Sequence, residues 1–139
     1  MVWRMNVLLD TCCFLWLALD VKRLSPRAVE TLNDESSKLF LSDVSLWEIT
    51  LKNTSGKLPL PSHPSHWLPS RRDFFRATAL PIRESAIFLT SELPLVHADP
   101  FDRLIAAQAI ENDFTILSPD VPLSRLGALR NRLEHFRVA

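Results

Sequence analysis

Five acidic side chains of this sequence could act together if the fold brings them to one place. They are Asp10, Glu48, Asp99, Asp102 and Asp120. Carboxylates that share a site repel one another, and at least one pKa rises strongly unless a cation lies between them. All-oxygen sites suit hard divalent ions such as Mg²⁺ and Mn²⁺. Such ions promote in-line phosphoryl transfer, so the acids indicate a metal site of this kind, although the pattern alone has low specificity.

Most of these acids also have an ordinary structural explanation. Asp10 and Asp99 suit helix N-caps, Asp102 suits the first turn of a helix, and Asp120 suits a turn. Thr11 could cap the helix after Asp10, however. An acid between two apolar segments would then be partly desolvated and would need a partner or a metal.

Glu48 is the most informative of these acids, because it occupies a position that is expected to face the core. It falls on the apolar stripe of a helix predicted over 42–53, where unpaired charges are rare. Two simpler interpretations remain open. Glu48 could close a capping box with Ser45, or it could form an ion pair with Lys52 one turn later.

Alternating strands and helices must position these acids. The sequence predicts strands at 5–9, 38–41, 77–82 and 114–117, with a last strand within 133–138, and helices at 12–19, 26–32, 42–53, 66–76, 83–93, 100–112 and 123–126. This alternation favours a parallel sheet covered on both faces, in a single domain over 1–139. Sites in such sheets lie outside the carboxyl ends of the strands, where Asp10 and Asp120 are expected.

The composition of the sequence argues against several other classes of protein. Lys+Arg and Asp+Glu both number 16, so nucleic-acid binding would have to rest on a local basic patch. Only two glycines occur, which excludes a P-loop and a G-x-G-x-x-G fingerprint. No apolar run approaches the roughly 20 residues of a membrane span. The two cysteines are adjacent, which disfavours a disulfide and fits a reduced, cytoplasmic setting.

Several motifs, in this order and spacing, resemble the PIN-domain family, in particular the VapC-type toxins of bacterial toxin–antitoxin pairs. They are Val7-Leu8-Leu9-Asp10-Thr11 with Phe14-Leu15-Trp16, Ser42 through Trp47-Glu48-Ile49 with Lys52, Gly56-Lys57-Leu58, Asp99 through Ala109, and Ile116-Leu117-Ser118-Pro119-Asp120. The resemblance covers nearly the whole chain. It implies a compact three-layer α/β/α fold with a central parallel sheet of about four to five strands.

The resemblance also implies roles for the acids. Asp10, Glu48 and Asp102 would be the main catalytic ligands of Mg²⁺ or Mn²⁺, with Asp120 as the usual fourth. Asp99 and Thr11 would each either cap a helix or support the metal ligands without binding the metal. The chain departs from the family pattern at two positions: Cys12 stands where close relatives often carry His, and Pro119 precedes Asp120.

The activity that the resemblance implies is metal-dependent endoribonuclease cleavage, in which metal-activated water attacks the phosphodiester bond of RNA. Arg103, Lys52 and Lys57 are the expected RNA contacts near the site. The implied partners are RNA, a second copy of the chain in a homodimer, and a VapB-type antitoxin whose tail covers the acids. No membrane partner is expected.

Three rivals share parts of this pattern. A haloacid-dehalogenase-type phosphotransferase needs a second Asp two residues after the first, and Cys12 occupies that position. A non-catalytic PIN-like interaction module would not need the acids that are present here. A housekeeping PIN-type nuclease shares the chemistry, and the sequence alone does not separate it from a toxin.

Overall fold

The computed structural model describes residues 5–93, 99–119 and 136–138. In chain order its elements are β1 (Met5–Leu9), α1 (Thr11–Leu19), the 3-10 helix η1 (Val21–Arg23), α2 (Pro26–Asn33), β2 (Ser37–Ser42), α3 (Asp43–Thr54), α4 (Pro64–Phe74), β3 (Thr78–Leu80), α5 (Glu84–Leu89), the 3-10 helix η2 (Thr90–Glu92), α6 (Pro100–Asn112), β4 (Thr115–Ser118) and β5 (Phe136–Val138). The helix predicted over 123–126 lies outside the described residues.

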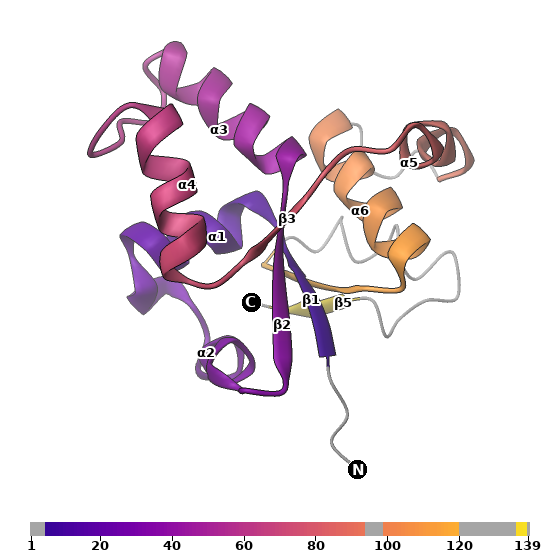
Figure 1. The fold of residues 1–139 in the computed structure, drawn as a ribbon, viewed down its shortest axis with the longest axis horizontal. Coiled ribbons are helices and arrows are strands. Elements are labelled where there is room, and N and C mark those ends of the chain that lie inside the picture. The colour runs from indigo at the N-terminus through magenta and orange to yellow at the C-terminus, as the bar shows by residue number, and fades with distance from the viewer. Residues whose placement is uncertain (1–4, 94–98, 120–135, 139) are drawn as a thin grey trace.

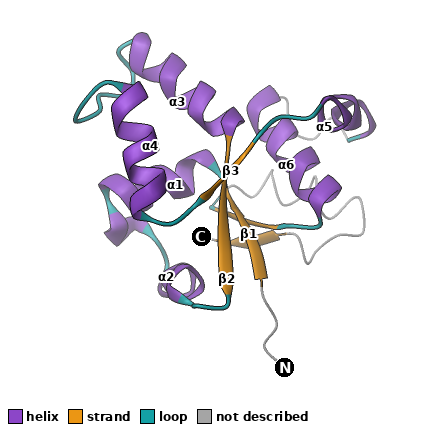
Figure 2. Cartoon of the chain, viewed as in Figure 1, coloured by secondary structure: helices purple, strands orange, loops and turns teal. Residues whose placement is uncertain are grey.

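The strands form one parallel sheet in the order β3-β2-β1-β4-β5. Figure 2 shows strands of this sheet in orange between the purple helices. In the central strand, Leu9 pairs with Leu41 of β2 and with Leu117 of β4. The chain moves outward from β1 in one direction through β2 and β3, then returns to the other side for β4. The carboxyl ends of β1 and β4 therefore form a topological switch point, which is where parallel α/β sheets place their sites.

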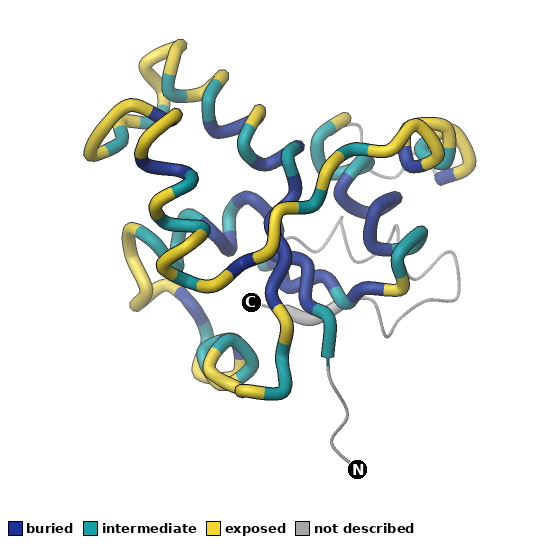
Figure 3. The backbone as a smooth tube through the Cα atoms, viewed as in Figure 1, coloured by how far each residue is buried: buried dark blue, intermediate teal, exposed yellow. Residues whose placement is uncertain are grey.

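Alternate residues of the central strand face opposite layers, as the two-residue period of a strand requires. Val7 and Leu9 are fully buried in a core with residues of α1, α2 and α4, whereas Leu8 packs in a second core with residues of α5 and α6. Figure 1 shows these helices on the two sides of the sheet, and Figure 3 shows the burial concentrated where they meet it. The predicted three-layer α/β/α fold is confirmed.

Helix α3 lies over the carboxyl edge of the sheet and contributes to both cores. Its Val44 belongs to the core on one face, and its Ile49 belongs to the core on the other. The helix follows β2 without a loop, because Ser42 ends the strand and its hydroxyl accepts the Val44 N–H at 3.0 Å as the N-cap. This direct junction carries Glu48 to the edge at which β1 and β4 end.

Helix α4 differs from its predicted range of 66–76. It begins at Pro64, since Nδ1 of His63 accepts the N–H of Ser65 at 3.1 Å and acts as the cap. It ends at Phe74, and Arg76 just beyond it takes a left-handed conformation with φ of 56°. In the part of the chain that the structure describes, every helix is too short or too polar to cross a bilayer.

Candidate active site

A pocket of about 500 Å³ opens at the switch point of the sheet. Its lining comprises Asp10, Thr11, Cys12, Leu15, Trp16, Glu48, Lys52, Asp99, Asp102 and Pro119. Elements far apart in the sequence supply these residues, chiefly the start of α1, the middle of α3 and the start of α6. Four of the five acids singled out by the sequence therefore share one pocket, and the fifth, Asp120, lies outside the described residues.

Asp10 is buried at the point where β1 passes into α1, with 3% of its surface exposed. Its Oδ1 accepts the N–H of Cys13 at 2.6 Å, so Asp10 is the N-cap of α1. The cap predicted at Thr11 is wrong, because Thr11 is already the first helical residue. The Thr11 hydroxyl donates instead to Oγ of Ser45 on α3 at 3.0 Å, joining two sides of the pocket.

The second carboxylate oxygen of Asp10 reaches a neighbouring strand. Ser118, the last residue of β4, donates its hydroxyl hydrogen to Oδ2 of Asp10. This hydrogen bond between positions 108 residues apart fixes the carboxylate at the switch point. The sequence placed Ser118 only in a turn after the strand, and the available signal for its role was a polar residue directly after the buried Ile116 and Leu117.

Glu48 is nearly buried on α3, with 7% of its side chain exposed. Its Oε2 accepts a hydrogen bond from Nζ of Lys52 at 2.8 Å, whereas its Oε1 is buried and has no hydrogen-bond partner among the described residues. The capping box with Ser45 is wrong, because α3 begins earlier, with Ser42 as its cap. The ion pair with Lys52 is present.

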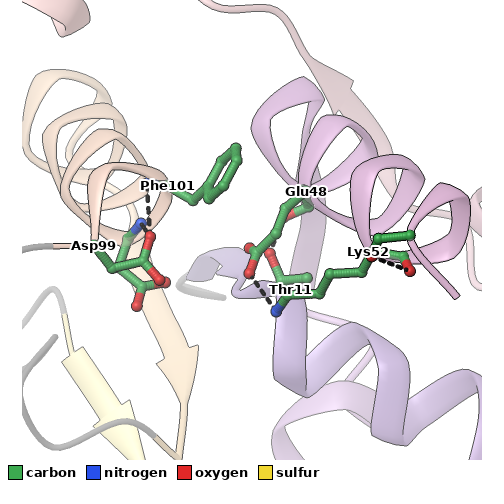
Figure 4. Close-up of polar contacts among 8 residues, drawn as sticks. Thr11, Glu48, Lys52, Asp99 and Phe101 are labelled. Carbon is green, nitrogen blue, oxygen red and sulfur yellow. Dashed lines mark hydrogen bonds and ion pairs between the residues drawn. The ribbon is translucent and has the colours of Figure 1, made fainter. Parts of the chain in front are cut away.

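Lys52 lies in the electrostatic field of the pocket. Its hydrogen bond with Glu48 raises the pKa of the Lys52 ammonium above its usual range. Partial burial opposes this shift, whereas the charge of Glu48 and, more weakly, the charges of Asp99 and Asp102 add to it. Figure 4 shows Glu48 and Lys52 of α3 facing Asp99 across the pocket. The ammonium therefore acts as a counter-charge for several carboxylates.

The acids of α6 divide into a cap and a first-turn residue. Oδ1 of Asp99 accepts the N–H of Phe101 at 2.9 Å and that of Asp102 at 3.5 Å, so Asp99 is the N-cap of the helix. Pro100 occupies the first helical turn, where its missing N–H costs nothing. Asp102 lies one position beyond Phe101, half-buried, and lines the pocket.

The basic residues expected to contact RNA lie in three different environments. Lys52 lines the pocket. Lys57 is exposed in the turn after α3. Nη2 of Arg103 donates to the main-chain oxygens of Thr90 at 2.6 Å and Leu93 at 3.0 Å, so its guanidinium supports the segment around η2. RNA contact by these three residues stays a prediction.

The donor set of the pocket fits a hard divalent cation. Its ligating atoms are carboxylate oxygens, which Mg²⁺ and Mn²⁺ prefer, and the buried Oε1 of Glu48 lacks a donor among the described residues. Among the same residues, no three acidic, imidazole or thiol side chains converge closely enough to form a preassembled metal site.

The fold and pocket define the chain as a parallel α/β domain with a carboxylate-lined site at its topological switch point. Comparison with known proteins gives the family. The model of the PIN domain matches residues 7–129. The chain therefore belongs to the PIN domain family.

Individual relatives agree with this assignment. The chain is similar to Ribonuclease VapC22 of Mycobacterium tuberculosis, with 27% identity over 117 residues, covering 83% of this chain and 87% of the relative. Among solved structures, it is similar in fold to a chain of VapBC2 from Rickettsia felis bound to a promoter DNA fragment, with a TM-score of 0.67, 17% identity and coverage of 96% and 98%. A chain of DNA-bound VapBC from Salmonella typhimurium gives a TM-score of 0.60, 16% identity and 97% coverage of each chain.

Proposed function

We propose that this chain is the toxin of a toxin–antitoxin pair and that it cleaves RNA as a metal-dependent endoribonuclease. The observation that carries the proposal is the meeting of Asp10, Glu48 and Asp102 in one pocket of a PIN domain. A curated relative aligned over most of the chain is named a ribonuclease, and structural neighbours are VapBC complexes. We further propose a cytoplasmic location, a homodimer and a VapB-type antitoxin as partner.

Asp10, Glu48 and Asp102 would hold Mg²⁺ or Mn²⁺, and Asp120 is proposed as the fourth ligand. Such an ion would supply positive charge to the scissile phosphate and activate water for attack. The chain positions the ligands by ordinary helix chemistry. The cap bond to Cys13 and the hydrogen bond from Ser118 fix Asp10. Glu48 lies on a helix that starts directly at the strand end.

Cleavage of RNA with and without divalent metal tests this proposal. The purified chain, freed from any co-purified antitoxin, should cut single-stranded RNA oligonucleotides in Mg²⁺ or Mn²⁺ and should lose this activity in EDTA. Asp102→Asn should abolish cleavage while circular dichroism stays unchanged. Asp73→Asn removes an exposed acid of α4 and is the matched control. Full activity of Asp102→Asn, or equal cleavage in EDTA, would contradict the proposal.

The toxin role has a separate test. A short reading frame beside the gene should encode a DNA-binding protein, and its product should bind this chain in a pull-down and inhibit cleavage. Nuclease activity without such a neighbour would favour a housekeeping PIN-type nuclease. A chain that binds no Mn²⁺ in calorimetry would favour a non-catalytic module.

A further inference from the structure

The ion pair between Lys52 and Glu48 differs from an ordinary pair on a helix surface. Such a pair usually joins two solvated side chains and contributes little. Here the carboxylate is nearly buried, with 7% of its side chain exposed, while the lysine side chain is 49% exposed. The lysine thus brings its charge from the solvent side to an acid that lies inside the pocket.

The environment of Glu48 explains why it needs a cation. A buried carboxylate is costly unless it is paired. Lys52 Nζ bonds only Oε2 of this carboxylate, and Oε1 has no donor among the described residues. Asp99 and Asp102 line the same pocket, so further negative charge faces the pair. In this arrangement one ammonium neutralises part of a carboxylate set that suits a divalent ion.

We propose that Lys52 is a resident cation of the acidic pocket, which competes with the divalent metal for Glu48 and must move away when the metal binds. This inference rests on the proposed function, because it takes Glu48 as a metal ligand. The half-exposed lysine stem lets the ammonium turn from Glu48 towards solvent at the pocket mouth. Released there, Lys52 is available to the phosphodiester backbone of the RNA substrate.

The alternative role for Lys52 is purely structural. A structural pair would hold Glu48 in the orientation that the metal needs, and its removal would then weaken metal binding. Competition predicts the reverse. The direction of the change in metal affinity therefore separates the two roles, and it does so without any measurement of catalysis.

Mn²⁺ binding to the full chain in the absence of RNA is the decisive measurement. Free Mn²⁺ is followed by electron paramagnetic resonance for the wild-type chain, Lys52→Met and Lys22→Met. Methionine keeps most of the apolar stem of Lys52 and removes its charge. Lys22 is an exposed lysine of η1, so Lys22→Met makes the same change in net charge away from the pocket. The control therefore corrects for any general gain in cation affinity.

We expect Lys52→Met to bind Mn²⁺ roughly three- to fivefold more tightly than the wild-type chain, the ratio that the loss of one competing ion pair gives. Lys22→Met should stay within about twofold of the wild-type chain, as expected for a screened surface charge. Saturating Mn²⁺ should also raise the melting temperature more for Lys52→Met than for the wild-type chain, because ligand binding to the native state stabilises it.

Equal or weaker Mn²⁺ binding by Lys52→Met would overturn the competition role while leaving the metal site intact. Absence of Mn²⁺ binding in all three proteins would overturn the proposed function as well, so the two failures are distinguishable. If Lys52→Met does not fold, Lys52→Arg replaces it. Arginine keeps the competing charge and should bind Mn²⁺ no more tightly than the wild-type chain; tighter binding by this variant would overturn the inference.

Discussion

The hydroxyl group of Ser118 donates a hydrogen bond to Oδ2 of Asp10, which links the end of β4 to the residue that follows β1. The other oxygen of Asp10 accepts the N–H of Cys13 at 2.6 Å. One buried carboxylate therefore caps a helix, joins two strands and faces the pocket. The orientation of the Asp10 carboxylate is therefore fixed from two directions.

Removal of the Ser118 hydroxyl group should destabilise the fold. Ser118→Ala leaves a buried carboxylate oxygen without this donor, and such a loss costs about 1–3 kcal/mol. Urea denaturation would measure the change in the free energy of unfolding. Ser62→Ala, at an exposed position in the loop before α4, is the control and should stay within about 0.5 kcal/mol of the wild-type chain. An equal, small effect of both substitutions would show that the strand-to-strand bond contributes little.

Substitution with asparagine should distinguish the roles of the two acids at the start of α6. Asparagine caps a helix about as well as aspartate, whereas alanine at an N-cap costs about 0.5–2 kcal/mol. We therefore expect Asp99→Asn to keep its stability and its RNA cleavage, and Asp99→Ala to unfold more readily. Asp102→Asn should keep its stability but lose cleavage. Thermal melts and RNA cleavage assays on the three variants test this division, and loss of cleavage in Asp99→Asn would make Asp99 a ligand.

The helix α6 shows what sequence reasoning could supply. Its range of 100–112 was predicted and confirmed, because an Asp cap, a proline in the first turn and a long apolar run act locally. The start of α1 was missed by one residue, since Asp10 and Thr11 both suit a cap and the choice depends on tertiary contacts. Only the fold shows that Thr11 turns to Ser45 instead.

In the site, too, local features could be predicted from the sequence, whereas features that depend on tertiary contacts could not. The acids were predicted because each falls at the end of a strand or near the start of a helix, and the pocket brings together Asp10, Glu48, Asp99 and Asp102. The hydrogen bond from Ser118 could not be predicted, since it depends on β1 and β4 being neighbours in the sheet. The ion pair of Glu48 was expected only as one alternative. The sequence suggested a pair on a solvated helix surface, whereas in the structure both Glu48 and Lys52 line the pocket.

Arg103 should contribute to stability through its main-chain contacts. Arg103→Met removes the donors to the carbonyl groups of Thr90 and Leu93, and a stability loss of about 1–3 kcal/mol is expected. Arg103→Lys should recover only part of the loss, since an ammonium lacks the planar fork of the guanidinium. Urea denaturation measures both variants. The same Arg103→Met variant tests the predicted RNA contact. If Arg103 binds a phosphate, the plot of log binding constant against log salt concentration should become less steep by about 0.7 for single-stranded RNA.

The last prediction concerns Cys13 and high pH. Burial chiefly, then the charges of Asp10 and Cys12, raises the pKa of the Cys13 thiol well above its ordinary value of 9.0. The native chain thus keeps this thiol neutral, whereas the unfolded chain ionises it above pH 9.0. The stabilising contribution is fully present below that pH and is lost as pH rises through the alkaline range, by up to about 1.4 kcal/mol per pH unit.

Urea denaturation between pH 7 and 10.5 would measure this contribution. Cys13→Ala should be less stable than the wild-type chain at neutral pH, because it leaves a small cavity in the core. The two free energies of unfolding should then converge above pH 9, since only the wild-type chain loses stability through this thiol. Val7→Ala, which opens a cavity in the same core without removing a thiol, is the matched control and should retain the wild-type dependence on pH. Parallel curves for Cys13→Ala and the wild-type chain over the whole range would contradict the assignment.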